Sequence, residues 1–323
     1  MDTKDALRAG LRSTPKYLPV WYRYDKAGSV YNDRCLMENT FYYFYKSEIS
    51  ILANNIKEII PDLAEAPHLV DMGSGNSEKT RGFIDALLQK HGHIQYLPVD
   101  ISEEFLSSVS DQISEIYGSK LTIKSVPGDY DIGIEKLSGM PGIKLITWLG
   151  GGFQNQSYED QVRRLKLLSN VMTEECRLII SLDITDDKEQ IENAYLDPTG
   201  ISADLYRNAI NRLNREYGSS INTATLVLEA EYIHNDRPEE TSYVTLCGVS
   251  QEKRTHDIPG LGITINLEKD ERFYLHEGKG LSCKYSIKQI QTLGLCGGLH
   301  LEHYWTDTSN HVAVCCFSTK KNS

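Results

Sequence analysis

The stretch from Leu69 to Thr80, L-V-D-M-G-S-G-N-S-E-K-T, constrains the fold of this chain more than any other. Its first residues suit a buried parallel strand, Gly73 and Gly75 permit a tight turn, and Ser77 with Glu78 can open the next helix. A G-x-G turn after a strand occurs in dinucleotide, flavin and S-adenosylmethionine sites alike. Glu78 stands where the third glycine of a dinucleotide fingerprint is expected, so the stretch predicts a nucleoside ligand without a pyrophosphate.

Strands and helices alternate from about residue 52 to residue 185. Further strands are predicted over 94–100, 121–126, 143–149 and 176–184, and amphipathic helices over 80–89 and 159–172. This succession predicts a doubly wound parallel sheet. In such sheets the ligand lies beyond the carboxyl ends of the strands, where the strand order reverses.

Polar residues stand at these strand ends. Asp100 ends the second strand, where it can accept hydrogen bonds from both hydroxyls of a ribose. Asp129 and Tyr130 follow the third strand and can reach an adenine amine and cover its ring. The fourth strand continues into G-G-G-F-Q-N, which ends at Asn155. Each acid alone also suits a helix cap, but several along one sheet edge favour a nucleoside site.

The section 186–282 interrupts this alternation. Helices are predicted over 188–195 and 203–217, strands over 226–234, 243–247, 263–267 and 272–276, and polar or glycine-rich connections over 249–261 and 277–281. The α/β pattern resumes with a helix over 287–293 and strands over 299–305 and 311–317. An insertion at this place is expected to form a lid over the same sheet edge. Residues 1–50 are rich in tyrosine, which suits either core packing or a pocket for an aromatic or cationic ligand.

The overall composition excludes several classes of function. The chain has 323 residues, 40% of them hydrophobic, and a formal charge of −11 without a basic run, which argues against nucleic-acid partners. No apolar run reaches the roughly 18 residues of a membrane span, and the N-terminus lacks an apolar signal. Seven cysteines without a C-x-x-C pair fit reduced thiols. We therefore expect a cytoplasmic protein. Neither His91 with His93 nor His300 with His303 has a carboxylate at ligand spacing, so we expect no bound metal. We also expect the protein to be a monomer with a small-molecule substrate.

A series of motifs along nearly the whole chain resembles one known family. They are Y-D-K-A-G-S at 24–29, Y-Y followed by K-S-E at 42–48, M-G-S-G-N-S-E-K-T-R at 72–81, Y-L-P-V-D-I-S-E-E at 96–104, G-D-Y at 128–130, L-G-G-G-F-Q-N at 149–155, A-Y-L-D-P-T-G at 194–200, N-R-E-Y-G at 214–218, S-C-K-Y at 282–285 and Y-W-T-D at 304–307. The sequence resembles the S-adenosylmethionine-dependent histidine N-methyltransferases of ergothioneine biosynthesis, the EgtD-type family. The continuation of the glycine turn into S-E-K-T-R is specific to this family.

The resemblance implies a Rossmann-like class I methyltransferase sheet with an inserted α+β substrate-binding domain. The substrate-binding domain would comprise residues 1–51 and 186–282, and the methyltransferase domain residues 52–185 and 283–323. Carried over by motif, the residues that bind S-adenosylmethionine would be Tyr24, Gly73, Lys79, Asp100 and Asp129, with Tyr130 beside them.

The acceptor in this family is an amino acid. The resemblance implies that Tyr42, Asn155 and Tyr195 hold its α-amino and carboxylate groups, with Asn155 and Tyr42 closest to the chemistry. Asn155 also has a physical case, because a side-chain amide offers a donor to a carboxylate and an acceptor to an amine without a charge that would keep the amine protonated.

The chain departs from the family at two acceptor positions. In the histidine enzymes an acid stands two residues before the serine of the S-x-K-Y motif and pairs with the imidazole ring; here that residue is Gly280, with Ser282 retained. A methionine of the family aligns with Val244. A larger, neutral pocket suits an indole, so the sequence favours tryptophan or a related indole amino acid as acceptor. Two alternatives stay open: Glu277 could restore histidine recognition, or the protein could bind S-adenosylmethionine without catalysis.

Overall fold

The structure is a computed structural model that describes residues 2–278 and 280–319. The chain forms two compact units. Unit 1 consists of Met1–Tyr43, Asp186–Asn235 and Ser242–Cys283, and unit 2 of Phe44–Thr185, Asp236–Thr241 and Lys284–Ser323. The domain boundary that we placed after residue 51 falls inside the continuous helix α3 (Tyr43–Ile59), whereas the compact units divide at the start of that helix.

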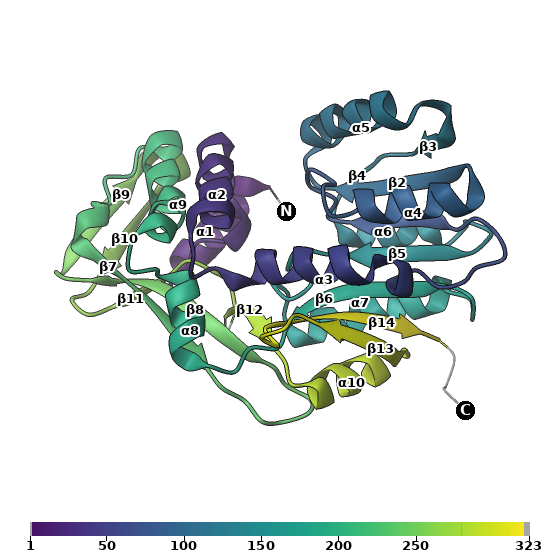
Figure 1. Cartoon of the computed structure of the whole chain (residues 1–323). Helices are drawn as coiled ribbons and strands as arrows, with labels where there is room; N and C mark the ends of the chain where they lie inside the picture. Colours follow the sequence, from purple (N-terminus) through teal and green to yellow (C-terminus); the bar gives the residue numbers. More distant parts are fainter. Residues whose placement is uncertain (1, 279, 320–323) are drawn as a thin grey trace. The chain divides into compact units, whose positions relative to one another are not determined.

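Unit 2 is built on a mainly parallel sheet with helices on it (Figure 1). Its strands are β1 (His68–Met72), β2 (Ile94–Asp100), β3 (Leu121–Ile123), β4 (Val126–Pro127), β5 (Lys144–Trp148), β6 (Arg177–Asp183), β13 (His300–Thr306) and β14 (Val312–Ser318). Its helices are α3, α4 (Arg81–His91), α5 (Glu103–Tyr117), η2 (Gly118–Lys120), α6 (Tyr130–Leu137), α7 (Tyr158–Val171) and α10 (Ile287–Cys296). The α/β fold with a doubly wound, mainly parallel sheet that we expected from the sequence is confirmed.

The strand order shows at which point along the edge of this sheet a ligand is expected to bind. The parallel part runs β3, β2, β1, β5, β6, and β14 then pairs antiparallel with β6. Because β2 lies on one side of β1 and β5 on the other, the order reverses between β1 and β5, which is where ligands bind in open α/β sheets. Nearly every residue of β1, β5 and β6 is buried, as in a sheet covered on both faces.

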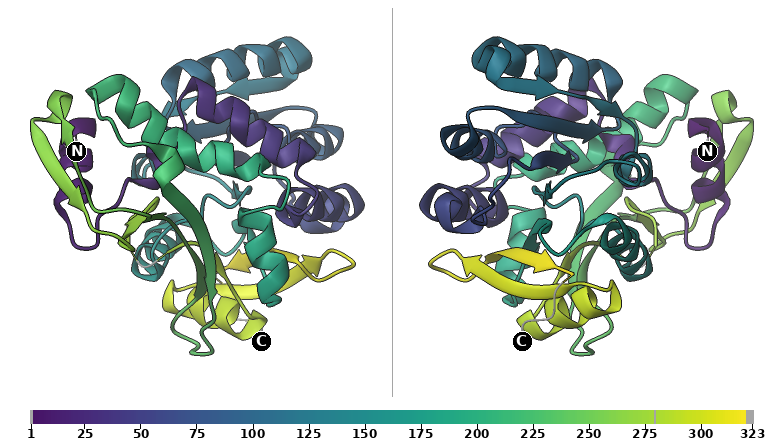
Figure 2. Two further views of the ribbon diagram at one scale, coloured as in Figure 1. Left: turned by 90° about the vertical axis from the view of Figure 1, so that its left-hand side faces the viewer. Right: turned by 90° about the vertical axis from the view of Figure 1, so that its right-hand side faces the viewer.

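Unit 1 combines helices with antiparallel strands. The helices are α1 (Thr3–Arg12), η1 (Val20–Arg23), α2 (Lys26–Glu38), α8 (Lys188–Tyr195), α9 (Ile201–Tyr217), η3 (Thr223–Thr225) and η4 (Pro259–Leu261). The antiparallel strands are β7 (Leu226–Ile233), β8 (Ser242–Ser250), β9 (Arg254–Ile258), β10 (Ile263–Leu267) and β11 (Arg272–Tyr274). Strand β12 (Leu281–Lys284) ends in unit 2, where Lys284 pairs parallel with Asp183 of β6. Strand β8 pairs with β7 and β11, and the separate hairpin of β9 and β10 lies against α1 (Figure 2).

Two secondary-structure predictions are wrong, and one short strand was not predicted. The polar connection expected over 249–261 contains β9, whose buried His256 and Ile258 alternate with exposed polar residues. The connection expected over 277–281 leads into β12, which is too short to give a periodic pattern. The single strand expected over 121–126 is divided into β3 and β4, which pair with β2 in two separate places, at Ile94–Tyr96 and at Val99–Asp100.

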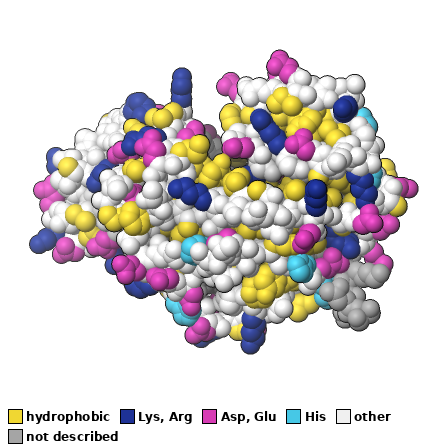
Figure 3. Space-filling model, in the orientation of Figure 1, with side chains coloured by type: hydrophobic (Ala, Val, Ile, Leu, Met, Phe, Trp, Pro, Cys, Tyr) yellow, Lys and Arg dark blue, Asp and Glu magenta, His cyan; other side chains and the backbone are white. Residues whose placement is uncertain are grey.

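Three further features of the described residues concern membrane-spanning helices, the cysteines and the surface charges. None of their helices is both long and apolar enough to cross a membrane. All seven cysteines are free thiols. Basic and acidic side chains are interspersed over the face that Figure 3 shows.

Candidate functional site

The glycine turn after β1 is joined to the end of β2. Gly73 and Gly75 have φ angles of 77° and 51°, a region that favours glycine. The backbone N–H of Gly73 donates to the carbonyl of Val99 at 2.8 Å, and that of Gly75 donates to Oδ2 of Asp100 at 3.0 Å. The structure therefore brings three residues predicted from the sequence, Gly73, Gly75 and Asp100, to the point where the strand order reverses.

The two acids at this edge also serve the local backbone. Oδ1 of Asp100 accepts from the N–H of Ser102 at 3.0 Å. Asp129 is the N-cap of α6, and its Oδ1 accepts from the N–H of Ile132 at 3.0 Å. No donor among residues 2–278 and 280–319 reaches the other carboxylate oxygen of Asp129. Asp129 thus caps α6 through Oδ1, and its Oδ2 is left for a ligand.

A buried hydrogen-bond network lies under the glycine turn. Asp71 of β1 accepts from the hydroxyls of Thr80 at 2.5 Å, Tyr96 at 2.9 Å and Thr147 at 3.1 Å. Burial raises the pKa of Asp71, while these donors act in the opposite direction. The hydroxyl of Ser77 lies 2.8 Å from that of Tyr96, so Ser77 belongs to this network and does not open the helix, which begins at Arg81. These buried hydrogen bonds hold the two ends of the glycine turn, Asp71 and Thr80, together.

Lys79 is held by an acid that the sequence analysis did not single out. Its Nζ donates at 2.6 Å to Oε2 of Glu48 on α3, and Oε1 of Glu48 accepts from the backbone N–H of Gly150 at 2.7 Å. A β-carbon built on Gly150 would lie 2.6 Å from the Lys79 Nζ. The turn after β1, the turn after β5 and α3 therefore meet at Glu48. The K-S-E motif at 46–48 was the only signal for this residue.

Tyr130 fills the space between two glycine segments of the edge. Its hydroxyl would lie 3.3 Å from a β-carbon built on Gly73 and 2.4 Å from one built on Gly152. Its ring lies 4.6 Å from the ring of Trp148, and the guanidinium of Arg164 lies over it at 5.6 Å. Tyr130 therefore stands at the predicted nucleoside edge, and its role as a cover for adenine stays a prediction.

Asn155 is an exposed residue of the turn that follows β5. Its neighbour Gln154 is buried and accepts from the backbone N–H of Asp183 at 3.0 Å, at the end of β6. The Asp183 carboxylate pairs at 2.9 Å with Lys284, and both side chains are almost completely buried. The loop that carries Asn155 is thus attached to the adjacent strand end by buried polar contacts.

In unit 1, the predicted ligand residues Tyr24 and Tyr195 lie in one neighbourhood around Tyr206. Burial raises the pKa of Tyr206 well above its usual range, and Arg23, Tyr195 and Tyr24 are its ionisable neighbours. Tyr24 is about half exposed and Tyr195 is buried at the end of α8. Tyr206 was missed by the sequence analysis because it lies inside an ordinary helical pattern.

Tyr42 is half-buried in unit 1, one residue before α3 begins. Its role in holding the amino acid stays a prediction.

The two predicted specificity positions, Gly280 and Val244, are also brought together in unit 1. A β-carbon built on Gly280 would lie 2.2 Å from Cδ2 of Tyr243 and 2.9 Å from the carbonyl oxygen of Val244. Val244 is fully buried, and Ser282 is buried with a φ of 52°. The ring of Tyr243 therefore occupies the place where a side chain at position 280 would project. Tyr243 was not among the residues predicted from the sequence.

Glu277 does not lie free beside this cluster. Its Oε2 accepts from the backbone N–H of Val20 at 2.7 Å, although the side chain is exposed. Glu277 thus connects the first residue of η1 to the segment after β11. A rearrangement that made Glu277 a ligand of the acceptor would have to break this bond.

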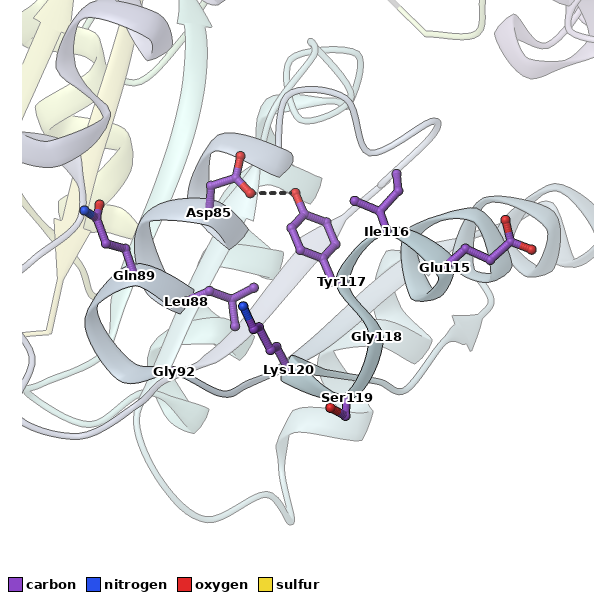
Figure 4. A pocket seen from close by; sticks show the side chains of 10 residues that line it. All are labelled: Asp85, Leu88, Gln89, Gly92, Glu115, Ile116, Tyr117, Gly118, Ser119 and Lys120. Atoms are coloured by element: carbon purple, nitrogen blue, oxygen red, sulfur yellow. Dashed lines mark hydrogen bonds between the residues drawn. The ribbon is translucent and has the colours of Figure 1, made fainter.

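An open groove of about 650 Å³ lies elsewhere on unit 2, between the carboxyl-terminal ends of α4 and α5 (Figure 4). The hydroxyl of Tyr117 donates across it to Asp85 at 2.8 Å, and burial together with Asp85 raises the pKa of Tyr117 to about 12. None of the predicted site residues lines this groove. Within the described part of the chain, no group of three or more metal-ligating side chains is found.

The comparison with protein families identifies the chain. The family model described as "Histidine-specific methyltransferase, SAM-dependent" matches residues 3–319. The chain belongs to this family. The family resemblance predicted from the motifs is confirmed, and the protein is an S-adenosylmethionine-dependent enzyme that N-methylates an amino acid.

Members and relatives of the histidine-specific methyltransferase family match nearly the full chain. Histidine N-alpha-methyltransferase of Mycobacterium tuberculosis is 29% identical over 301 residues, which cover 93% of this chain and 89% of that protein. The protein of the same name from Mycolicibacterium smegmatis is 27% identical, with coverage of 93% and 90%. The 4-dimethylallyltryptophan N-methyltransferase of Claviceps purpurea is 23% identical, with coverage of 94% and 91%.

Proposed function

We propose that this methyltransferase acts on the α-amino group of L-histidine. The relatives that match it with the highest identities reported above are histidine Nα-methyltransferases. Tryptophan is favoured by the sequence alone, because Gly280 and Val244 carry less bulk than the family's residues at these positions. The observation that supports histidine instead is the ring of Tyr243 beside Gly280, where a β-carbon would lie only 2.2 Å away. The ring of Tyr243 occupies the space that a side chain at position 280 would fill. The glycine therefore does not by itself create room for an indole.

A tryptophan-type acceptor is the second candidate. It is favoured by the absence of an acid at Gly280, because a carboxylate there would give imidazole a charge-assisted hydrogen bond that other rings lack. It is also favoured by the similarity to the 4-dimethylallyltryptophan enzyme, which covers 94% of the chain. Under this candidate the ring of Tyr243 would have to move to admit an indole.

The proposed chemistry is an in-line displacement at the methyl group of the sulfonium cofactor. The protein has to place a neutral amine behind the methyl carbon, and a nearby cationic cofactor lowers the pKa of that amine. We assign Tyr42, Asn155 and Tyr195 to the amino and carboxylate groups of the acceptor, and Ser282, Gly280 and Val244 to its ring. We assign Gly73, Lys79, Asp100, Asp129 and Tyr130 to the cofactor, with Tyr24 beside it. No covalent nucleophile is needed.

A competition assay tests the acceptor. The protein is incubated with S-adenosylmethionine and equal concentrations of histidine, tryptophan, tyrosine and tryptamine, and the methylated products are identified by mass. We expect methylated histidine as the main product. Methylated tryptophan as the main product would replace histidine by the second candidate. Binding of S-adenosylmethionine without any methylated product would support the non-catalytic alternative for this panel of amines.

Two coarser expectations remain proposals. The seven free thiols are compatible with the reducing cytoplasm, where we place the enzyme. We also propose that it acts as a monomer on a small-molecule substrate without nucleic-acid or membrane partners.

A further inference from the structure

Glu48 is a fully buried acid at the ligand edge of unit 2. Its side chain has no exposed surface, although a carboxylate is among the groups most costly to remove from water. Two donors compensate that cost: the ammonium of Lys79 at 2.6 Å and the backbone N–H of Gly150 at 2.7 Å. The two carboxylate oxygens are divided between them, one to each donor. Glu48 therefore connects the turn after β1 to the turn after β5, across the point where the strand order reverses.

The geometry restricts where the Lys79 ammonium can lie. A lysine side chain has a flexible stem and would otherwise sample many positions. Here Nζ is held by the bond to Glu48 and lies 5.5 Å from the centre of the Tyr45 ring. It also lies close to Gly150, where an added β-carbon would be 2.6 Å from Nζ. Gly150 adopts a φ of 79°, which favours glycine, and a side chain there would have to displace the ammonium of Lys79.

Lys79 keeps hydrogen-bonding capacity after this contact. An ammonium group has three N–H donors, and among the described residues Glu48 is its only hydrogen-bond acceptor. The Lys79 side chain is still one-fifth exposed, whereas Glu48 is inaccessible. A ligand at this edge can therefore reach the ammonium but not the acid behind it.

We propose that Glu48 is a positioning residue for the amino-acid end of the methyl donor and acts through Lys79 and the Gly150 amide. The inference rests on the proposed assignment of Lys79 to the cofactor. The amino-acid end of S-adenosylmethionine is a zwitterion whose carboxylate suits an ammonium donor. Because Glu48 neutralises Lys79, the edge offers that zwitterion a directed donor without a net positive charge. The nucleoside end of the cofactor, assigned to Asp100 and Asp129, does not depend on Glu48.

Calorimetric titration with two ligands separates these roles. S-adenosylhomocysteine carries the amino-acid end, and 5′-methylthioadenosine is the matching nucleoside thioether without it. For Glu48→Gln we expect the Kd of S-adenosylhomocysteine to rise about tenfold, as for members of one hydrogen-bond network, and that of 5′-methylthioadenosine to change less than about twofold. Glu58→Gln, on the exposed side of the same helix, is the matched control and leaves both constants unchanged.

A double-mutant cycle tests the route through Lys79. If Glu48 acts through Lys79, adding Glu48→Gln to Lys79→Met weakens S-adenosylhomocysteine binding no further than Lys79→Met alone. Equal weakening of both ligands by Glu48→Gln, unchanged binding of both, or full additivity with Lys79→Met overturns the inference. If the Gln variant does not fold, Glu48→Asp, which retracts the charge by one methylene, gives the same ligand comparison.

The two proposals are distinguished by comparing ligand binding in these titrations with histidine methylation by the wild-type enzyme. Failure of histidine methylation by a protein that binds S-adenosylhomocysteine selectively through Glu48 would reject the proposed acceptor and retain this inference. Methylation of histidine with no selective effect of Glu48→Gln would do the reverse.

Discussion

The residues that we propose for the ring of the acceptor lie close together in unit 1, and their contacts with each other cannot be read from the sequence. In the sequence, Gly280 indicates a smaller residue where the histidine enzymes carry an acid. In the structure, the ring of Tyr243 lies where a β-carbon at position 280 would project. The consequence for Gly280→Glu changes accordingly. From the sequence alone this substitution should shift preference towards histidine, whereas the structure shows that the new side chain must first displace the ring of Tyr243.

We expect Tyr243→Ala to raise the ratio of kcat/KM for tryptophan to that for histidine by about tenfold, since added space in an apolar pocket is worth about 1–3 kcal/mol in discrimination. Initial rates with each amino acid provide the measurement. Gly280→Glu alone should lower thermal stability, and combined with Tyr243→Ala it should recover stability. An unchanged substrate ratio in Tyr243→Ala would remove Tyr243 from the acceptor site.

The buried ion pair between Lys284 and Asp183 gives a second expectation at the residue scale. Its atoms are 2.9 Å apart and both side chains are nearly inaccessible, so Lys284→Met leaves an uncompensated carboxylate in the interior. We expect a loss of about 3–5 kcal/mol in the free energy of unfolding, measured by urea denaturation. Lys288→Met, an exposed lysine of the following helix, is the control and should change stability by less than about 0.5 kcal/mol.

At the scale of elements, α9 depends on an acid in the loop before it. Asp197 accepts from the backbone N–H groups of Ser202 at 2.8 Å, Thr199 at 3.1 Å and Ile201 at 3.2 Å. Burial alone would raise the pKa of Asp197, but these donors and the Thr199 hydroxyl outweigh it and lower the pKa to about 2. The same loop follows directly after Tyr195, so the carboxylate that begins α9 lies two residues beyond the end of α8.

The sign of the resulting pH dependence follows from the lowered pKa. Because the folded-state pKa of Asp197 lies below its ordinary value near 4, its contribution is complete above about pH 4 and is lost as the pH falls towards 2. Asp197→Asn should therefore lower the free energy of unfolding by about 2 kcal/mol at pH 7 and reduce the acid dependence between pH 4 and 2. Asp204→Asn, in the exposed first turn of α9, is the control. A pH profile that Asp197→Asn leaves unchanged would contradict this account.

The sequence predicted those elements whose periodicity is carried by their own residues. Helix α8 and strands β2 and β10 begin and end where we expected, because buried and exposed positions alternate clearly within them. Strand β12 was missed because its pairing with β6, through Lys284 and Asp183, is a tertiary property. Glu48 and Tyr243 were missed for the same reason. Their importance comes from Lys79 and Gly280, which are distant in sequence, whereas Gly73 and Asp100 could be found because strand ends share one edge.

At the scale of the whole molecule, the proposed cofactor residues other than Tyr24 lie in unit 2, and all proposed acceptor residues other than Asn155 lie in unit 1. Unit 2 is assembled from distant parts of the chain: β14 pairs antiparallel with β6 over six residues from Val312 to Phe317. The chain leaves unit 2 after Thr185, contributes the short segment Asp236–Thr241 to it, and returns for the last time at Lys284, which is the register partner of Asp183. The exit and return points are therefore neighbours on adjacent strands, about 5 Å apart in the hydrogen-bonding direction.

This arrangement makes the division of labour testable with one shortened protein. Residues 44–185 joined to residues 284–323 by a linker of about six Gly/Ser residues retain β1 to β6 and the hairpin of β13 and β14, and such a linker easily spans adjacent strands. Once circular dichroism shows that it folds, we expect it to bind S-adenosylhomocysteine with a Kd within about tenfold of the full chain, a difference of about 1.4 kcal/mol. It should methylate no amino acid. Asp100→Ala in the shortened protein is the negative control. A folded fragment without affinity would mean that unit 1 supplies more of the cofactor site than Tyr24, and a fragment that methylates histidine would move the acceptor residues into unit 2.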